Sequence, residues 1–226
     1  MAIWDRWRKT PPPTEPRGTV GRATLAGLPP PDLEHVPELQ HPWGHRVWDR
    51  MWRSDPDIRR VVRMVIAPIL AATWQVHPAG GDKATDIDRE AAELAEWALW
   101  EFMRPALPEH LAEALPVLVR SGFAPFEQVW ASAEWRGRTV QVPATLQLRL
   151  PRTITRFFTN ELGQLVEVEQ QPDSGPPVRI PAQNLVWYRV GGEGDQWVGE
   201  SMLRPAYKPW LIKDRLISRV YKPGPH

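Results

Sequence analysis

Proline is spread along the whole of this 226-residue sequence, and it constrains the possible folds more than any other residue type. There are 26 prolines, more than double the average share of about 5%. Each proline fixes its own φ and removes a backbone donor from a β-ladder, so long uninterrupted sheets are disfavoured. The sequence therefore predicts many short elements joined by fixed turns.

The first part of the chain lacks the apolar periodicity of a domain. Residues 1–44 contain few aliphatic side chains, and PPP occurs at residues 11–13 and 29–31. We interpret this segment as an extended N-terminal arm with polyproline character. Trp4 and Trp7 are candidate subunit-contact aromatics, which would anchor the arm on a neighbour. An unanchored terminus with incidental tryptophans is the alternative.

Residues 45–226 are predicted to form one folded domain that begins with helices. Asp55 as N-cap and Pro56 at the first helical position open one helix, and Thr85 with Asp88 resembles a capping box that opens another. The predicted helices cover residues 47–52, 55–66, 85–103 and 107–121. Pro68 is expected to end the second of these helices, Pro105 the third and Gly122 the fourth. A strand is expected over Ile69–His77.

Two of these helices carry apolar residues that are expected to face a core. In the 55–66 helix the apolar positions recur at helical spacing, and Arg59, Arg60 and Arg63 lie outside them. These positions are Ile58, Val61, Val62, Val65 and Ile66. Trp97 and Trp100, three residues apart on the 85–103 helix, are expected in the core. The carboxylates of that helix are interpreted as its solvated face: Glu90, Glu93, Glu96 and Glu101.

After Gly122 the period of the apolar residues changes from 3.6 to 2, which is typical of strands. Trp135-Arg-Gly-Arg138 is a predicted hairpin turn between strands near 126–130 and 139–142. A second hairpin turn is expected at 160–163, before a strand over 165–169, and a further strand over 185–190. Helices, a β-rich middle and a closing helix together predict the fold class α+β.

The closing helix is predicted within Gly199–Val220, with Ser201 as its cap and with Pro209 either restarting or kinking it. A buried stripe is expected at the recurring apolar positions: Leu203, Tyr207, Trp210, Leu211, Leu216, Ile217 and Val220. The other face is basic, with six cations against Asp214 alone, a net +5: Arg204, Lys208, Lys213, Arg215, Arg219 and Lys222. This face has three possible roles, namely a solvated surface, ion pairs to a neighbouring subunit, or DNA guidance.

Tryptophan is unusually common, with 13 residues against only 3 tyrosines. Trp130, Trp187 and Trp210 fall on apolar positions and are predicted to pack inside the domain. Trp135 and Trp197 fall in turns instead. They are therefore candidate subunit-contact aromatics, with packing inside the chain as the alternative.

Charge and composition exclude several classes of protein. The formal net charge is +1, so a global basic field is absent and any contact with DNA must come from a local stripe. The chain has no cysteine, which excludes disulfides and thiolate metal sites and suits a cytoplasmic assembly. The longest apolar run, Met64–Trp74, is interrupted by Pro68 and is far too short to span a membrane, so no membrane partner is expected.

Motifs for catalysis and for metal binding are missing from the sequence. Neither GxxxxGK[ST] nor GxSxG occurs, and Ser201 is interpreted as a cap rather than a nucleophile. Pro42 and Gly44 lie between His41 and His45 and argue against a shared helical face for these two residues. No metal site is therefore expected in the cluster His35, His41 and His45. The acids at 82–88 lack EF-hand spacing. No enzyme, cofactor or metal is therefore expected.

Several sequence blocks, taken together in their order along the chain, resemble the portal proteins of Mu-like tailed bacteriophages. The strongest is the run G-x-S-x-L-R-P-A-Y-x-x-W-x-x-K, which begins at Gly199. The others lie upstream and extend the resemblance over roughly residues 45–220: Ser54–Arg59, Pro68–Val76, Gly122–Trp130, Pro151–Ile154 and Asn184–Val186. Each block alone is ordinary packing sequence, and their common order carries the resemblance.

The resemblance implies a structural role. Portal proteins of this family form a ring, usually of twelve copies, at one vertex of the capsid in the virion, assembled in the host cytoplasm. The ring passes double-stranded DNA during packaging and ejection, docks the packaging motor, and connects the head to neck and tail proteins. The matched blocks correspond to the portal wing, and the closing helix leads toward the stem.

The sequence departs from the family pattern in length. Portals of this type are about twice as long, and the stem, clip and crown sequences are missing here. The chain is therefore expected to be a truncated or split portal, or a wing-derived module. A non-enzymatic head-completion or accessory interaction module is the alternative function. A nucleic-acid-processing enzyme is a further alternative, but it would need acids clustered on strands, and these are not evident.

Overall fold

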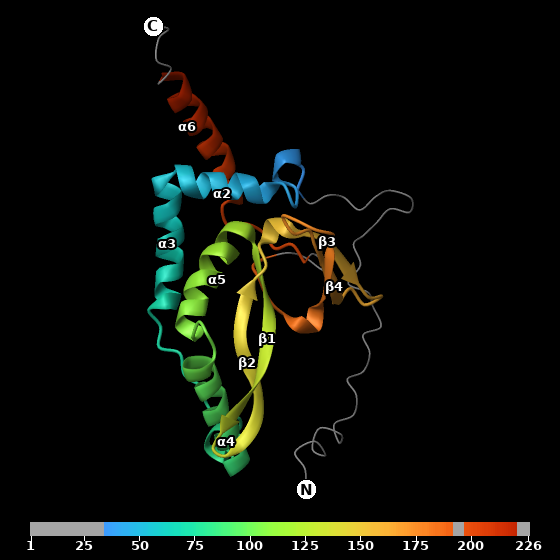
Figure 1. Cartoon of the computed structure of the whole chain (residues 1–226). Helices are drawn as coiled ribbons and strands as arrows, with labels where there is room; N and C mark the ends of the chain where they lie inside the picture. Colours follow the sequence, from blue (N-terminus) through green and yellow to red (C-terminus); the bar gives the residue numbers. More distant parts are fainter. Residues whose placement is uncertain (1–33, 192–196, 221–226) are drawn as a thin grey trace.

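The computed structural model describes residues 34–191 and 197–220 as a mixed α+β fold (Figure 1). The predicted fold class is confirmed. The longer helices are α2 (Gly44–Ser54), α3 (Pro56–Leu70), α4 (Asp86–Trp97), α5 (Leu107–Ser121) and α6 (Tyr207–Val220), with a π-helical turn, η3, at Ala98–Phe102. The strands are β1 (Phe123–Trp135), β2 (Arg138–Leu148), β3 (Ile154–Thr159), β4 (Leu165–Gln170), β5 (Val178–Pro181) and β6 (Leu185–Arg189).

The strands form two antiparallel sheets of three strands each, in the orders β2-β1-β6 and β3-β4-β5. The β1–β2 turn is tight because Arg136 and Gly137 both adopt positive φ, at 50° and 74°. That geometry matches the right-handed twist of the flanking strands. The hairpin turn predicted at 135–138 is confirmed.

One hydrophobic core joins three helices to the segment that enters α6. Trp48 and Met51 of α2, Val62 of α3 and Val119 of α5 are buried there, together with Trp210. A second core lies between the sheets around Phe123, which is fully buried and stacks on Trp187 with ring centroids 5.1 Å apart. The body is therefore built on both sides of the α5–β1 junction.

The α2–α3 corner is set by Asp55, which was predicted as an N-cap. Its carboxylate accepts from the backbone N–H groups of Asp57 and Ile58, at 2.9 and 3.4 Å. The helix then continues two residues past Pro68, because the N–H of Ala71 still donates to the carbonyl of Ala67 at 2.9 Å. Residues 71–77 pair with no strand in the part of the chain that the structure describes, so the predicted strand over Ile69–His77 is wrong.

The predicted boundaries of the next two helices hold closely. The capping box of Thr85 and Asp88 is present at the start of α4, and α5 ends where Gly122 adopts φ 79°. Trp97 and Trp100 are half-buried rather than core residues. None of the residues of α4 itself is buried.

A crossing of two glycines positions the segment that leads to α6. A Cβ atom on Gly199 would lie 1.9 Å from the carbonyl oxygen of Gly122, so only glycine fits there. The same carbonyl accepts from Val190, and the carbonyl of Val190 accepts from Glu200, both at 2.8 Å. The end of α5, the end of β6 and the approach to α6 are thereby joined backbone to backbone.

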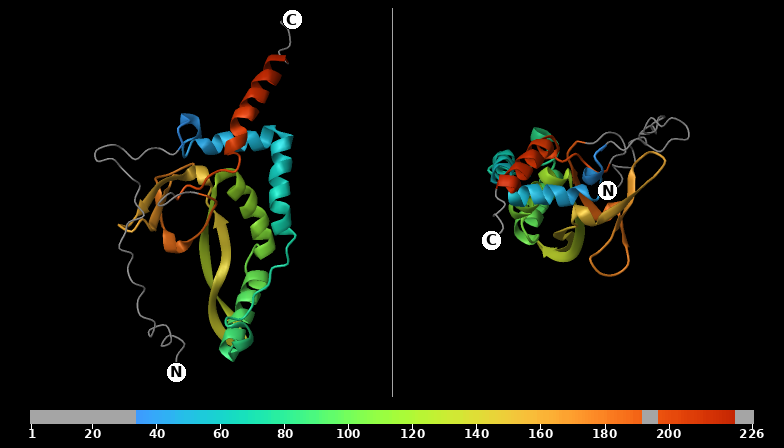
Figure 2. Two further views of the ribbon diagram at one scale, coloured as in Figure 1. Left: turned by 180° about the vertical axis from the view of Figure 1, so that it is seen from behind. Right: turned by 90° about the horizontal axis from the view of Figure 1, so that it is seen from above.

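The molecule is elongated, with α6 and α4 at opposite ends (Figures 1 and 2). Helix α6 projects beyond α2, whereas α4 lies beside the far end of the β1–β2 hairpin. Packing on the domain begins before residue 45, because Leu39 is buried in the core beside Trp48 and Glu34 pairs with Arg204. Residues 1–33, which form most of the predicted arm, lie outside the described residues.

Candidate assembly surfaces

The base of α6 is anchored in the body, as the sequence predicted for its first apolar positions. Leu203, Tyr207 and Trp210 are all buried, and the ring of Tyr207 meets Trp48 edge to face with centroids 6.4 Å apart. Ser201 is buried and accepts from the backbone N–H of Leu203 at 3.1 Å, which fits a capping role. Pro209 lies in the first turn of α6, so the helix restarts after a 3-10 turn at Arg204–Ala206.

Ion pairs fix the second turn of α6 to the α2–α3 corner. Lys213 Nζ lies 3.0 Å from a carboxylate oxygen of Asp55 and 3.2 Å from one of Asp57, and Arg50 lies 2.8 Å from Asp214. Burial by itself raises the pKa of the Asp55 carboxyl, but hydrogen bonds from Lys213 and two backbone amides outweigh burial and hold that pKa below its ordinary value. Asp55 thus caps α3 and anchors α6 at once.

The outer half of α6 differs from the prediction. The exposed fractions of Leu216, Ile217 and Val220 are 57%, 51% and 81%, and that of Ile212 is 60%. The predicted buried stripe therefore ends near Leu211, because α6 leaves the body and none of the described segments of the chain lies beside its last turns (Figure 1). This exposed apolar stripe is unusual for a surface helix.

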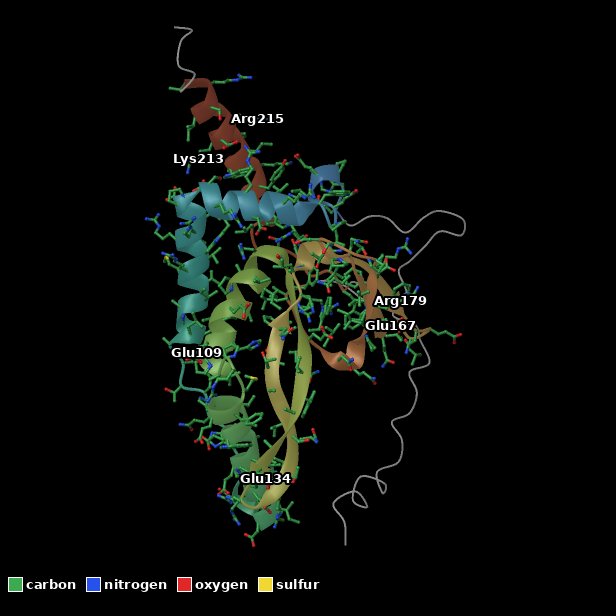
Figure 3. The ribbon with its side chains drawn as sticks, in the orientation of Figure 1. Glu109, Glu134, Glu167, Arg179, Lys213 and Arg215 are labelled. Carbon is green, nitrogen blue, oxygen red and sulfur yellow. The ribbon has the colours of Figure 1, made fainter. Side chains whose placement is uncertain are left out.

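The basic residues that were predicted to share one face of the closing helix divide into two groups. Arg204 pairs with Glu34 and Lys213 with Asp55, so these two cations act within the chain. Lys208, Arg215 and Arg219 are exposed, and no ion pair is formed by them within residues 34–191 and 197–220. Figure 3 shows Lys213 and Arg215 on the projecting helix. Lys222 lies outside the described residues.

The outward side of α3 is a second exposed surface, and it was not predicted. The exposed fractions of Val61, Met64 and Val65 are 54%, 67% and 38%, so Val61 and Val65 do not join the core with Ile58, Val62 and Ile66 as expected. One helix face of α3 is enough to contact α2 and α5, which leaves the flanks of the stripe in solvent. A shallow hollow on the same helix is lined by Pro56, Arg59, Arg60, Arg63, Met64 and Ala67.

A comparison with known families identifies the class of protein to which the chain belongs. The family model for the portal protein of Mu bacteriophage matches residues 45–220. The chain belongs to this portal family. Portal proteins are structural proteins of virions, so the family is not one of enzymes. The match begins at α2 and ends at the last residue of α6.

A solved structure supports the fold of this portal chain. A chain of the virion of a native gene transfer agent (GTA) particle superimposes with a TM-score of 0.53 at 14% sequence identity. The alignment covers 81% of the portal chain and 47% of the virion chain, so the portal chain spans less than half the length of that relative. A search of the curated proteins finds no match.

Two histidines of the portal chain meet although the sequence argued against it. His45 Nε2 and His41 Nδ1 are 3.0 Å apart, and His41 Nε2 donates to the carbonyl of Ile154 at 2.6 Å. His41 must then accept from His45, which leaves His45 Nδ1 as a buried acceptor with no partner among the described residues. Burial lowers the pKa of His41 to about 4. Burial and the neighbouring His41 and Arg152 lower the pKa of His45 to about 3.

This contact could not have been found from helical spacing, because it depends on Ile154, which lies 113 residues further along the chain. Within the described residues it joins two histidine side chains and one backbone carbonyl. Within residues 34–191 and 197–220, no three His, Asp or Glu side chains converge as a metal site would require. Likewise, the helices in this described part are too short or too polar to cross a membrane.

The candidate contact tryptophans are already partly covered by their own chain. Trp135 is 8% exposed and lies under the guanidinium of Arg136, 4.7 Å from the ring centre. Trp197 is half-buried, and its carbonyl accepts from the indole N–H of Trp187 at 3.2 Å. Subunit contacts of Trp135 and Trp197 remain predictions, and Trp4 and Trp7 lie outside the described residues.

The exposure of Trp130 also differs from the prediction, in the opposite direction. It was predicted to pack inside the domain, but 55% of it is exposed. A register shift between Val129 and Trp130 breaks the alternation of β1, and β6 pairs with β1 only as far as Glu127. The ring therefore has no neighbouring strand on that side to cover it.

Proposed function

We propose that this chain is a structural, non-catalytic subunit of a portal ring at the capsid vertex, where double-stranded DNA enters and leaves the particle. One observation carries the proposal beyond family membership. Helix α6 leaves the body with an apolar stripe and a basic face that its own described chain neither covers nor neutralises. A ring of copies supplies a use for both.

The apolar stripe is the part that neighbouring copies would cover. A helix of 14 residues is marginal on its own in water, and most helical stability in proteins comes from packing of an apolar face. Ile212, Leu216 and Val220 recur every four residues on the projecting part of α6, with Ile217 beside them. Burying this stripe against the α6 helices of adjacent copies would remove it from water and bring the helices together around an axis.

The basic face is the part that DNA would meet. Lys208, Arg215 and Arg219 are exposed on α6 on the side away from Ile217. Attraction between such cations and phosphates is independent of DNA sequence and weakens with salt, which suits a polymer that must move past the helix. The net charge of the whole chain is only +1, so this local stripe is where an interaction with DNA is expected.

The remaining parts of the proposal follow the portal family. We place the chain in the virion after assembly in the host cytoplasm, in a ring of twelve copies that contacts the capsid and the neck or tail proteins. Residues 1–44 would act as an arm with Trp4 and Trp7 as anchors on a neighbour, and residues 45–226 as the wing leading to the stem. The packaging motor would dock on the rest of a full-length portal.

Negative-stain electron microscopy with mass photometry tests this function on the purified chain, alone and with the polypeptide encoded directly downstream. Rings with a central hole are expected in at least one sample. A variant with Leu216→Asp and Ile217→Asp should keep its circular dichroism spectrum and lose the rings, because the charges lie in the stripe to be buried. Small monodisperse particles in every sample would contradict a ring and favour an accessory module of the head.

A further inference from the structure

We propose that α4 of one copy docks on the outward face of α3 of the next copy. The inference rests on the proposed portal function, which requires neighbouring copies, and it names the two surfaces that meet. We call these surfaces the α3 face (Arg59, Arg60, Val61, Arg63, Met64 and Val65) and the α4 surface (residues 86–97).

The α3 face combines exposed apolar side chains with three arginines, of which Arg59 already donates to the backbone carbonyls of Trp52 and Arg53. Met64 is 67% and Val61 is 54% exposed, next to the hollow formed with three arginines. Arg60 lies 3.4 Å from Asp57, a carboxylate that Lys213 also contacts. Arg63 forms no ion pair with any described residue. The face therefore fits a partner that is apolar at its centre and acidic around it.

The α4 surface has that composition and is only partly covered by its own chain. No residue of α4 is buried, although the helix carries Ile87, which is 53% exposed, and the half-buried Leu94 and Trp97. Two ion pairs hold α4 at the turn of the β1–β2 hairpin, from Arg136 to Glu93 at 2.7 Å and from Arg138 to Glu90 at 2.9 Å. Exposed ion pairs of this kind add little stability.

Charge separates the two surfaces into opposite poles. Residues 81–102, which contain α4, carry seven acidic and two basic side chains, a net charge of −5 that the paired Arg136 and Arg138 reduce to −3. Helices α2, α3 and α6 with Asp55 carry ten basic and four acidic side chains, a net charge of +6. The two regions lie toward opposite ends of the molecule (Figures 1 and 2), so the poles of one copy cannot neutralise each other by contact.

The same charges select the type of contact between copies. Two α3 faces placed against each other would bring arginine onto arginine, so a symmetric contact of this face with itself is disfavoured. A contact of α3 with α4 joins two different surfaces. It leaves one α3 face and one α4 surface free on the two joined copies. Such head-to-tail contacts generate rings when the rotation closes, which is the arrangement that a portal requires.

Disulfide cross-linking tests the contact directly, because the chain has no cysteine of its own. Copies with Met64→Cys are mixed with copies with Ile87→Cys and oxidised, and products are separated without reductant. Covalent dimers are expected in the mixture and not with either variant alone. The matched control mixes the Met64→Cys copy with Val166→Cys, at a site that is 48% exposed on the β3-β4-β5 sheet. Equal dimer yields in both mixtures would overturn the proposal.

Charge reversal provides an independent measurement by sedimentation velocity at low ionic strength. Arg60→Glu with Arg63→Glu, or Glu96→Lys on the α4 surface with Glu101→Lys in the turn that follows it, should weaken self-association by about tenfold or more. One chain carrying all four changes should recover part of it, since the four changed side chains then again have opposite charges on the two surfaces. Arg156→Glu with Arg179→Glu, on the β3-β4-β5 sheet, changes the net charge by the same amount as Arg60→Glu with Arg63→Glu. This control variant should leave self-association unchanged.

The outcomes separate this contact from the proposed function. Rings in the microscope without α3–α4 cross-links would overturn the contact and leave the portal function standing. Cross-links without rings would support the contact and count against a ring of this chain. Absence of both would overturn both. Failure of the four-change chain to recover self-association would also count against the pairing of these two faces.

Discussion

Trp210 and Leu216 lie on the same helix in opposite environments. Trp210 is 5% exposed and packs beside Tyr207, whereas Leu216 is 57% exposed on the projecting half of α6. We expect Trp210→Ala to lower the free energy of unfolding by about 3–5 kcal/mol, because it opens a cavity in the core. Leu216→Ala should change it by less than about 0.5 kcal/mol in dilute, monomeric chain.

Urea denaturation followed by tryptophan fluorescence and circular dichroism measures both changes. The pair is its own control, since the two substitutions lie in one helix and both end in alanine. A cost of Leu216→Ala close to that of Trp210→Ala in monomeric chain would mean that the outer stripe is covered within a single copy. That result would remove the main argument for packing between copies.

The buried histidine pair makes stability depend on pH. Both pKa values in the folded chain, about 4 for His41 and about 3 for His45, lie below the ordinary 6.5. As the pH falls below 6.5, the unfolded chain takes up protons that the folded chain refuses, so the free energy of unfolding falls until the folded pKa values are reached. Above pH 6.5 both rings are neutral in both states, and their contribution is constant.

Urea midpoints measured from pH 7 to pH 4 check this dependence. His45→Phe keeps an aromatic ring beside Phe123 and removes one titrating group, so its midpoint should fall less steeply with acid than that of the wild type. His110 is also buried with a lowered pKa and stays in both proteins, which makes it an internal control. Parallel slopes for the two proteins would contradict the role of the pair. Arg152 and Arg120 both lie near Asp49, and this group of charged side chains is the same in the two proteins.

At the scale of elements, the start of α3 depends on one carboxylate. Asp55 accepts from two backbone N–H groups at the helix start, whereas the neighbouring Asp57 is exposed. Asp55→Ala should cost about 1–2 kcal/mol of stability through loss of the cap, and it also removes the partner of Lys213. Asp57→Ala, the matched control, should cost clearly less. Equal costs in thermal or urea unfolding would show that the cap is not the main contribution.

Local rules allowed most of these elements to be predicted. The cap at Asp55, the capping box at Thr85, the turn at Gly137 and the stop at Gly122 each depend on a few adjacent residues. The coverage of an apolar face depends instead on where a whole element lies. Val61, Trp130 and Leu216 were therefore predicted as buried and are exposed, and the contact of His41 with β3 was missed. The ordered motifs predicted the portal family and the importance of α6, but not the α3 and α4 surfaces.

At the scale of the whole molecule, the exposed cations of α6 should control the interaction with DNA. Lys208→Gln, Arg215→Gln and Arg219→Gln together should leave the melting temperature nearly unchanged, because these side chains form no ion pair with the described chain. For random-sequence double-stranded DNA, the slope of the logarithm of the binding constant against the logarithm of the salt concentration should decrease. The decrease should correspond to the loss of up to about three phosphate contacts.

Fluorescence anisotropy over a range of salt concentrations gives this slope. The control variant replaces three cations on another part of the chain, Arg156, Arg179 and Arg189, by glutamine, which keeps the same change in net charge. Loss of DNA binding equal to that of the α6 variant would mean that binding follows net charge alone. An unchanged slope for the α6 variant would place the contact with DNA elsewhere.

Helix α6 is fixed to the body at one end only. The contacts that fix it are the burial of Trp210 in the core and the ion pairs of Lys213 with Asp55 and of Arg50 with Asp214, all within its first two turns. The remaining turns to Val220 are free of the body (Figure 1). A sideways push on that free end therefore reaches the α2–α3 corner as a torque. Because Asp55 also starts α3, the same push acts directly on the first turn of that helix.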